Sequence, residues 1–202
     1  MPEGKNGSTQ KNLILEKASV LFWEKGYTET SMKDIAAACG FRPANIYNYF
    51  DKKETILFEI LHEEMEGIVG PIRPLLHDAS LSPERALKRV IENHLKLTLG
   101  ERRGSMLLFD VGLNSLSAES RKKIIRLRDE YDEIASAILG RGMETGVFRE
   151  IDRKMVVFSI SSMIARSRIW YSPKKKYTID MLVDFIYDFA MKGLENRKSG
   201  RT

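Results

Sequence analysis

The stretch CGFRPANIYNYF, residues 39–50, gathers side chains that can bind the edges of nucleic-acid bases. An arginine can form two hydrogen bonds with guanine, and an asparagine amide can do the same with adenine. Tyrosine hydroxyls and lysine ammonium groups reach phosphates instead, which positions a protein on DNA without reading its sequence. The base-reading candidates are Arg42, Asn45 and Asn48, and the phosphate candidates are Tyr47, Tyr49, Lys52 and Lys53.

A second interpretation of this stretch stays open. Ile46 and Phe50 lie one helical turn apart, so they would form one buried face of a short helix. An aromatic, amide-rich helix of this kind could serve only to pack inside a bundle, with the ring of Tyr47 on the core and its hydroxyl outside.

Two short helices joined by a tight turn would place these side chains. Ser31 and Asp34 predict a variant capping box at the start of a helix of small residues, and Gly40 is suited to end it. Pro43 then fits the first position of a second helix, which extends to about residue 49. This is a helix-turn-helix arrangement, in which the second helix lies in the major groove and the Ser31 end of the first faces phosphate.

The rest of the chain has only helical periodicity. Asp51 and Glu54 predict a capping box for a helix that continues to about Val69, and Pro71 and Pro74 break the chain after it. No strand pattern or internal repeat appears, so we expect an all-α fold of about nine helices with a domain boundary near residues 50–60. The other expected helices cover residues 12–25, 82–97, 106–111, 117–145, 153–170 and 179–194.

Composition bounds the class of protein without deciding it. The 202 residues are 43% hydrophobic, which is enough for a core, and the net charge of +5 is compatible with a nucleic-acid partner. Residues 1–60, however, hold eight Lys/Arg and eight Asp/Glu, so charge alone would not indicate DNA binding. The single cysteine excludes an internal disulfide framework, and no signal or membrane-spanning stretch is present. We therefore expect a cytoplasmic protein with no membrane partner.

The candidate enzyme motifs fail on spacing. His62-Glu63-Glu64 lacks the second histidine one turn later that a zinc-protease helix requires. The glycines between Gly140 and Gly146 follow no strand, so they are not a dinucleotide fingerprint. Cys39 is interpreted as a packing residue. We therefore expect no catalytic residue, no metal site and no cofactor.

Residues 26–57, GYTETSMKDIAAACGFRPANIYNYFDKKETIL, resemble the TetR family of bacterial regulators. The match covers the Gly-Tyr pair after the first helix, the Thr-Ser pair followed by Asp-Ile-Ala, the Cys-Gly turn, Ile-Tyr-x-x-Phe and Lys-Glu-x-x-Leu. The polar residues 1–10 predict a flexible tail. The resemblance implies a DNA-binding domain at 11–55 and a ligand-binding and dimerisation domain at 56–202. The implied function is a dimeric repressor that a small ligand releases from a palindromic operator.

Within the helix-turn-helix, the resemblance implies that Lys53 contacts a phosphate and that Tyr47 contacts the DNA backbone. Arg42 stands where the family usually has a serine, Ala44 where it often has glycine, and Lys52 where it has a small polar residue. These departures predict an operator unlike those of relatives. The full predicted DNA interface is Ser31, Arg42, Pro43, Ala44, Asn45, Tyr47, Asn48, Tyr49, Lys52 and Lys53.

The resemblance also implies that the last two helices form the dimer interface. Residues 153–170 and 179–194 are apolar over most of their circumference, and a terminal helix with so wide an apolar face needs cover on two sides. A partner subunit would supply that cover, and a thick monomeric core is the alternative. The predicted interface residues are Phe158, Met181, Phe185 and Phe189.

The C-terminal region further resembles a subgroup of the family that senses fatty acyl-CoA. Trp170-Tyr171-x-Pro173 and Gly146-Val147-Phe148 carry this looser match. It implies an apolar cavity for an acyl chain, with arginines facing phosphates; alternatively, the apolar members are core and the arginines are solvated. The predicted ligand residues are His94, Arg102, Arg103, Met106, Phe109, Tyr131, Met163, Arg166 and Trp170.

The expected switch is mechanical, because a ligand acts only by favouring one arrangement of the recognition helices over another. The helix from Lys52 to about Val69 joins the two predicted domains and would transmit the change. The alternative function is a helical protein–protein interaction module without sequence-specific DNA binding.

Overall fold

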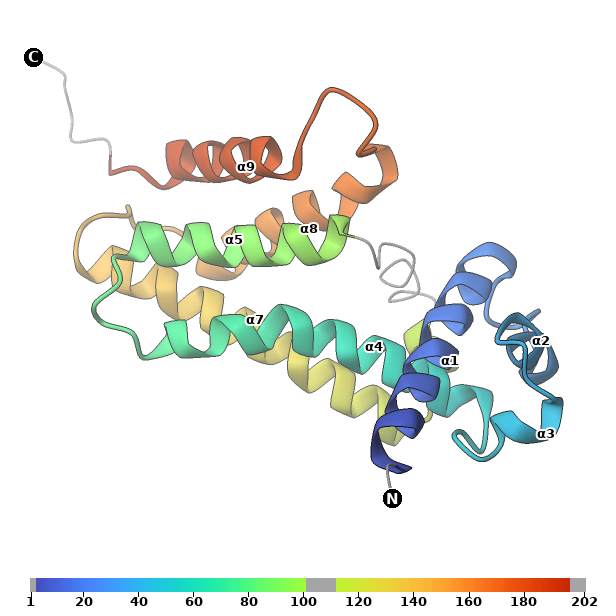
Figure 1. Ribbon diagram of the computed structural model, residues 1–202. Helices are drawn as coiled ribbons and strands as arrows, with labels where there is room; N and C mark the ends of the chain where they lie inside the picture. Colours follow the sequence, from blue (N-terminus) through green and yellow to red (C-terminus); the bar gives the residue numbers. More distant parts are fainter. Residues whose placement is uncertain (1–2, 101–111, 197–202) are drawn as a thin grey trace, which may run out of the picture. The chain divides into compact units, whose positions relative to one another are not determined.

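The computed structural model describes residues 3–100 and 112–196 of the chain, with side chains from residue 8 onward. These residues form α-helices and two 3₁₀ helices without a strand, which confirms the all-α prediction (Figure 1). The predicted helix at residues 106–111 lies outside the described residues. The elements are α1 (Glu3–Lys25), α2 (Met32–Ala38), α3 (Pro43–Ile46), α4 (Lys53–Val69), η1 (Gly70–Leu76), α5 (Pro83–Leu99), η2 (Leu113–Ser115), α7 (Ala118–Glu144), α8 (Arg153–Trp170) and α9 (Ile179–Leu194).

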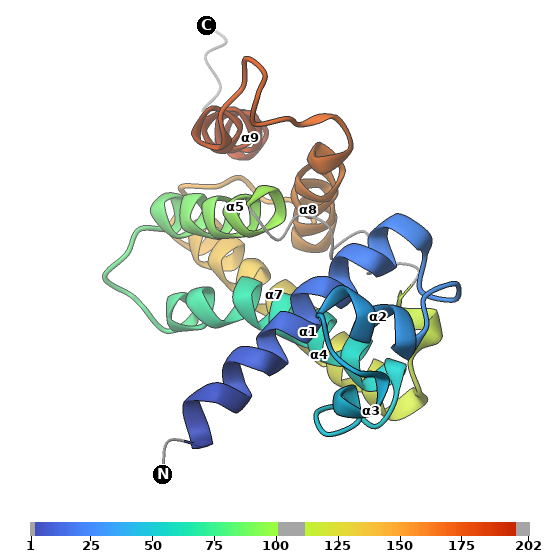
Figure 2. The ribbon, with the colours of Figure 1, turned by 45° about the vertical axis from the view of Figure 1, so that its right-hand side comes forward.

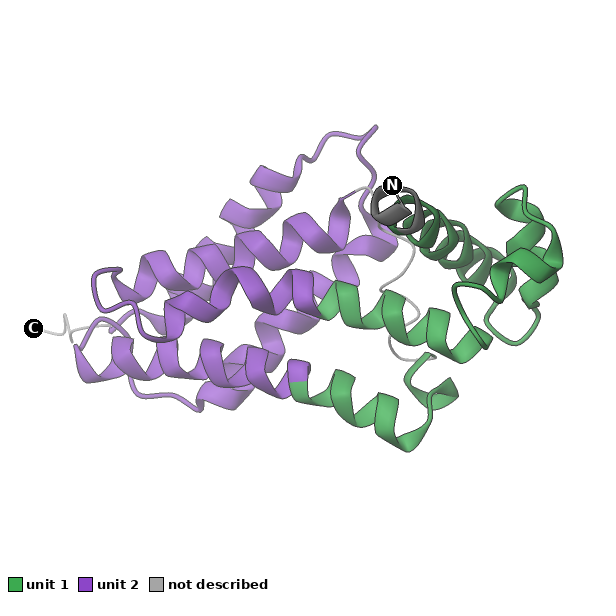
Figure 3. Cartoon of the chain, turned by 60° about the horizontal axis from the view of Figure 1, so that its bottom comes forward, with its two compact units in different colours: residues 1–65, 104–126 green, residues 66–103, 127–202 purple. Residues whose placement is uncertain are grey.

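The chain divides into two compact units (Figure 3). Unit 1 comprises Met1–Met65 and Gly104–Arg126, and unit 2 comprises Glu66–Arg103 and Leu127–Thr202. Helices α4 and α7 each run from one unit into the other. The predicted boundary after residue 55 separates a DNA-binding domain from a ligand-binding domain, and it stays a prediction.

Unit 1 is built on the apolar stripe of α1, where Ile14, Ala18 and Phe22 are buried at helical spacing. Gly26 ends the helix with a φ of +87°, a conformation that L side chains rarely adopt. The helix begins at Glu3 rather than at residue 12, because no proline interrupts these residues and extending a formed helix adds one hydrogen bond per residue. The predicted flexibility of residues 1–10 stays a prediction.

Unit 2 is centred on α5, which packs against both α8 and α9 (Figures 1 and 2). Its buried positions recur every three to four residues, and burying each leucine, isoleucine or valine among them contributes about 1.5–3 kcal/mol. They are Ala86, Leu87, Val90, Ile91, His94, Leu95, Thr98 and Leu99. Among the described residues, no helix is long and apolar enough to span a bilayer.

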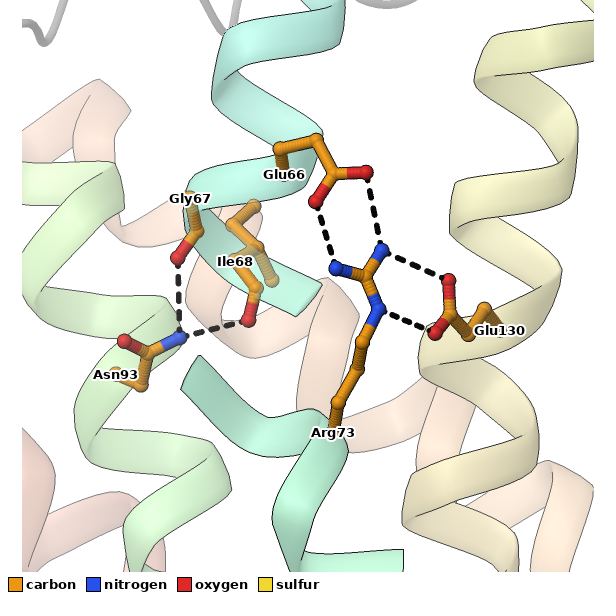
Figure 4. Close-up of polar contacts among 6 residues, drawn as sticks. All are labelled: Glu66, Gly67, Ile68, Arg73, Asn93 and Glu130. Atoms are coloured by element: carbon orange, nitrogen blue, oxygen red, sulfur yellow. Dashed lines mark hydrogen bonds and ion pairs between the residues drawn. The ribbon is translucent and has the colours of Figure 1, made fainter. Parts of the chain in front are cut away.

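A charged cluster fixes the segment after α4, where the two prolines form a 3₁₀ helix rather than only breaking the chain. The Arg73 guanidinium donates to both Glu66 oxygens at 2.8 and 3.0 Å and to both Glu130 oxygens at 2.6 and 3.1 Å (Figure 4). Asn93 donates to the carbonyl of Ile68 at 2.7 Å. The last turn of α4 is thus held to η1, α5 and α7 within unit 2.

Candidate functional site

The first helix of the predicted motif begins at a complete capping box. The Ser31 hydroxyl accepts a hydrogen bond from the Asp34 amide at 3.1 Å, and the Ser31 amide donates to the Asp34 carboxylate at 2.8 Å. The Ser31 hydroxyl also donates to that carboxylate at 2.6 Å, and these hydrogen bonds lower the pKa of Asp34. The predicted box is confirmed, and it leaves Ser31 exposed at the N-terminus of α2.

The turn between the helices follows from one glycine and one proline. Gly40 has a φ of +70°, and the Phe41 amide donates to the carbonyl of Ala36 at 2.8 Å. Arg42 then adopts an extended backbone before Pro43, as a residue preceding proline should. The Arg42 side chain makes no capping hydrogen bond to α3, so its guanidinium takes no part in starting the helix.

The second helix, α3, is shorter than predicted. It ends at Ile46, and the chain continues in turns in which the Tyr49 and Phe50 amides both donate to the Ile46 carbonyl at 3.0 Å. Ile46 and Phe50 are buried, which confirms the prediction that they form one buried face. The tight turns after α3 keep the backbone close to a helical course up to Phe50, because their hydrogen bonds span three to four residues as in a helix.

Most of the predicted DNA-facing side chains lie on the surface. Tyr47 is 56% exposed, so its ring does not serve as a core residue. The exposed members of the predicted set are Ser31, Arg42, Pro43, Ala44, Asn45, Tyr47, Asn48 and Lys52. The structure therefore brings arginine, amide, phenol and ammonium groups together on one short segment.

Tyr49 and Lys53 have intramolecular partners. Tyr49 is half-buried, its ring stacks on Phe41 with centroids 6.4 Å apart, and its hydroxyl donates to the side-chain oxygen of Gln10. Lys53 donates to backbone carbonyls of the turn between α1 and α2. Both residues thus hold unit 1 together, which sequence spacing did not indicate.

The start of α4 has a partner that sequence analysis missed. Glu54 was expected to complete a capping box with Asp51, but its carboxylate accepts a hydrogen bond from the Ser117 amide at 2.8 Å. That bond is the main reason why the pKa of Glu54 falls to about 2. Asp51 instead accepts from the Thr55 hydroxyl at 2.6 Å. No local pattern signals the Glu54–Ser117 contact, because the two residues are far apart in the chain.

In unit 2, two of the predicted ligand residues meet in the core. His94 Nδ1 lies 3.0 Å from the Tyr131 hydroxyl, and the rings pack edge to face with centroids 5.2 Å apart. Burial lowers the pKa of His94 to about 4, and the charge of Arg168 adds to the effect. Burial also raises the pKa of Tyr131. Arg168, which was not predicted, is itself buried and belongs to this polar cluster.

The other described members of the predicted ligand set, Met163, Arg166 and Trp170, differ in exposure. Met163 is half-buried, whereas Arg166 and Trp170 are exposed. An open groove of about 460 Å³ lies between α7 and the start of α8, and none of the predicted ligand residues lines it. Its lining residues are Glu133, Ser136, Ala137, Asp152, Arg153 and Lys154. Arg102, Arg103, Met106 and Phe109 lie outside the described residues.

The predicted dimer residues are exposed apolar side chains on α8 and α9. Phe185 is 69% and Phe189 59% exposed, and their rings stack with centroids 6.4 Å apart. Phe158 and Met181 are exposed as well. The opposite side of α9 is buried through Leu182, Val183 and Ile186, so apolar residues lie on both sides of this helix.

The fold and the exposed segment together define a helix-turn-helix transcriptional regulator. Residues 14–60 match the family model described as "Bacterial regulatory proteins, tetR family". Residues 80–194 match the model described as "Tetracyclin repressor-like, C-terminal domain". The chain therefore belongs to the TetR family.

Relatives of known structure or function share most of their length with this chain. The TetR family regulator PfmR from Thermus thermophilus is 37% identical, with a TM-score of 0.81 over 91% of this chain and 99% of PfmR. The transcriptional repressor KstR2 from Rhodococcus jostii is 25% identical over 95% of this chain and 93% of KstR2. AibR, solved with isovaleryl coenzyme A and operator DNA, has the same fold with a TM-score of 0.78, 23% identity and coverage of 89% and 97%.

Proposed function

We propose that this chain is a homodimeric repressor that reads a two-fold symmetric operator through α3 and the turns after it. The observation that carries the proposal is that Ile46 and Phe50 are buried, whereas Arg42, Asn45, Tyr47 and Asn48 on the same short segment are exposed. Arg42, Asn45 and Asn48 would read bases. Tyr47 and Lys52 would contact phosphates, as would the Ser31 end of α2.

The homodimer is supported by the apolar face of α8 and α9. Phe158, Met181, Phe185 and Phe189 would meet the same residues of a second copy in a two-fold interface. Exposed phenylalanine rings that stack on each other, as those of Phe185 and Phe189 do, are unfavourable in a monomer in water. A two-fold dimer would also present two copies of α3 to half-sites about one DNA turn, roughly 34–36 Å, apart.

The proposed effector is an apolar molecule such as an acyl-CoA, bound in the domain that follows residue 55. The AibR complex supports this class, because it joins the same fold to a coenzyme A thioester and to operator DNA. Residues 1–10 would be a flexible tail and residues 11–55 the DNA-binding region. The protein would act in the cytoplasm and without catalysis, as a regulator.

Base preference tests the proposed reading residues. Asn48→Ala should reduce discrimination between matched and mismatched operators by about 1–3 kcal/mol, because it removes a base contact. Lys52→Ala is the matched control, since removing a phosphate contact weakens all sequences to a similar degree. Competitive binding of a duplex library measures both. A wild-type chain that binds no duplex, at low salt or high, would leave the alternative of a protein–protein interaction module.

Effector release is tested on the operator complex itself. Acyl-CoA molecules of increasing chain length should lower operator affinity, with the longer chains acting at lower concentrations as more apolar surface is buried. Free coenzyme A is the matched control without an acyl chain. An operator affinity that no acyl-CoA changes would remove this ligand class from the proposal.

A further inference from the structure

Lys53, the first residue of α4, has its ammonium group surrounded by the turn that joins α1 to α2. Its Nζ donates to the carbonyl oxygens of Tyr27 at 2.6 Å, Thr28 at 3.2 Å and Thr30 at 2.6 Å. An ammonium group has three N–H donors, so these three carbonyls occupy all of them. The bonds join residues that are 23 to 26 positions apart in the chain.

An aromatic ring closes the same site. The Lys53 Nζ lies 4.3 Å from the ring centroid of Tyr27, within the range of a cation–π contact. The Tyr27 ring in turn packs edge to face on the buried Phe22, with centroids 5.2 Å apart. Burial lowers the pKa of Lys53 from its ordinary value, which marks the ammonium as partly withdrawn from water. The half-buried Lys53 side chain thus points toward the turn between α1 and α2.

The turn that Lys53 binds leads directly into α2. Thr30 is buried, and its hydroxyl donates to the carbonyl of Gly26 at 2.8 Å. The next residue is Ser31, which forms the capping box of α2. Lys53 therefore joins the beginning of α4 to the beginning of α2, and α3 lies between these two points in the chain.

We propose that Lys53 is a positioning residue for DNA binding, which sets the N-terminus of α2 relative to α3 and α4, and that it is not a phosphate contact. The inference rests on the proposed operator binding and assigns Lys53 a role different from the phosphate contact that resemblance implied. Lys52 would then make the phosphate contact at this end of the motif. Its side chain is 59% exposed, and among the described residues its one ion pair is with Glu54, at 3.2 Å.

The salt dependence of operator binding separates the two roles. Each phosphate contact adds about 0.9 to the slope of log affinity against log salt concentration. Lys53→Met should therefore leave the slope unchanged while weakening binding by a similar factor at every salt concentration. Lys52→Met, the matched control, should lower the slope by about 0.9. Both are measured well below the unfolding temperature, where a side chain that only adds stability leaves affinity unchanged.

Hydrogen exchange in the full chain tests the same inference without DNA. Lys53→Met should accelerate exchange of the amides at residues 27–35, and Lys52→Met should not. Lys53→Arg keeps the charge, but its planar fork does not converge on three carbonyls, so it should also lose protection and affinity. A slope lowered by about 0.9 in Lys53→Met, or full affinity and protection in Lys53→Arg, would overturn the inference. If the wild-type chain binds no duplex, the proposed function fails, and unchanged exchange in Lys53→Met is then the overturning result.

Discussion

Two exposed surfaces of this regulator have opposite chemistry. On unit 1, the surface around α3 displays a guanidinium, two amides and a phenol, while Ile46 and Phe50 beneath it are buried. On unit 2, the surface of α8 and α9 displays phenylalanine and methionine side chains above a helix whose other side is also apolar. Exposure is common to both surfaces, and the kind of side chain distinguishes them.

The difference indicates two kinds of partner. Polar side chains stay hydrated in the isolated chain and exchange water for base edges and phosphates at little cost. Exposed phenylalanine rings gain by leaving water, so they favour a surface of the same kind. In the proposed homodimer, a second copy would supply such a surface and would double the polar surface that meets the DNA. The following predictions test this comparison.

The largest expected effect comes from a charge in the apolar surface. Phe185→Asp should weaken self-association by on the order of 3 kcal/mol, or more than a hundredfold, because it buries a carboxylate at the centre of the proposed interface. Sedimentation velocity over a range of concentrations measures the shift to monomer. Operator affinity should fall with it, although α3 is unchanged.

A matched control separates this effect from a general effect of surface charge. Arg89→Asp places the same carboxylate on the exposed side of α5 and should leave self-association unchanged. A Phe185→Asp chain that sediments as the wild type does would show that this surface is not the dimer interface.

A smaller effect is expected from the polar residues that unit 2 keeps buried. His94 is neutral in the folded chain because its pKa lies at about 4, below the ordinary 6.5. The unfolded chain binds the proton more readily, so stability should fall as the pH falls from 6.5 toward 4. Between pH 7.5 and 5 the loss amounts to about 2 kcal/mol, since one pKa unit corresponds to about 1.4 kcal/mol.

Urea unfolding at the two pH values measures this loss. His94→Gln has no imidazole to protonate, so its stability should depend on pH by about 2 kcal/mol less than that of the wild type. His77→Gln, at an exposed position, is the control and should behave as the wild type does. Equal pH dependence in all three proteins would contradict the burial of an uncharged His94.

The smallest effect compares one helix cap in each unit. Ser31→Ala should lower the free energy of unfolding by about 1 kcal/mol through loss of the capping box, and it should also weaken operator binding. Ser82→Ala removes the cap of α5, where the Arg85 amide donates at 3.4 Å, and should cost less stability. Operator affinity should not change in Ser82→Ala. If both variants bind the operator as the wild type does, the start of α2 is not part of the interface.

Local features of the sequence were sufficient to predict the helix-turn-helix. Ser31, Gly40 and Pro43 act within a few residues of themselves, and Ile46 and Phe50 follow from a single helical turn. The contacts that fix this motif in place were not predictable in the same way. The bonds from Lys53 to the turn after α1 and from Glu54 to Ser117 join distant parts of the chain, and no spacing rule signals them.

The predictions for unit 2 show the same limit. Periodicity placed α8 and α9 correctly, because their apolar positions recur along one helix. Periodicity did not identify Arg168 as a buried arginine, because Arg166 lies only two residues away on the same helix. Tertiary packing of α8, which contacts α5, decides that Arg168 is buried and Arg166 is exposed. The ion pairs of Arg73 with Glu66 and Glu130 likewise join three separate elements, η1, α4 and α7.

The symmetry of the DNA sequence that the chain selects tests the central claim most directly. Wild-type protein is incubated with a library of random duplexes, and the bound sequences are determined after several rounds of enrichment. The account predicts an inverted repeat whose half-sites are separated by about one helical turn, because the two-fold axis of the proposed α8–α9 dimer would relate two copies of α3. Enrichment of a single asymmetric site, or of no sequence at all, would contradict it.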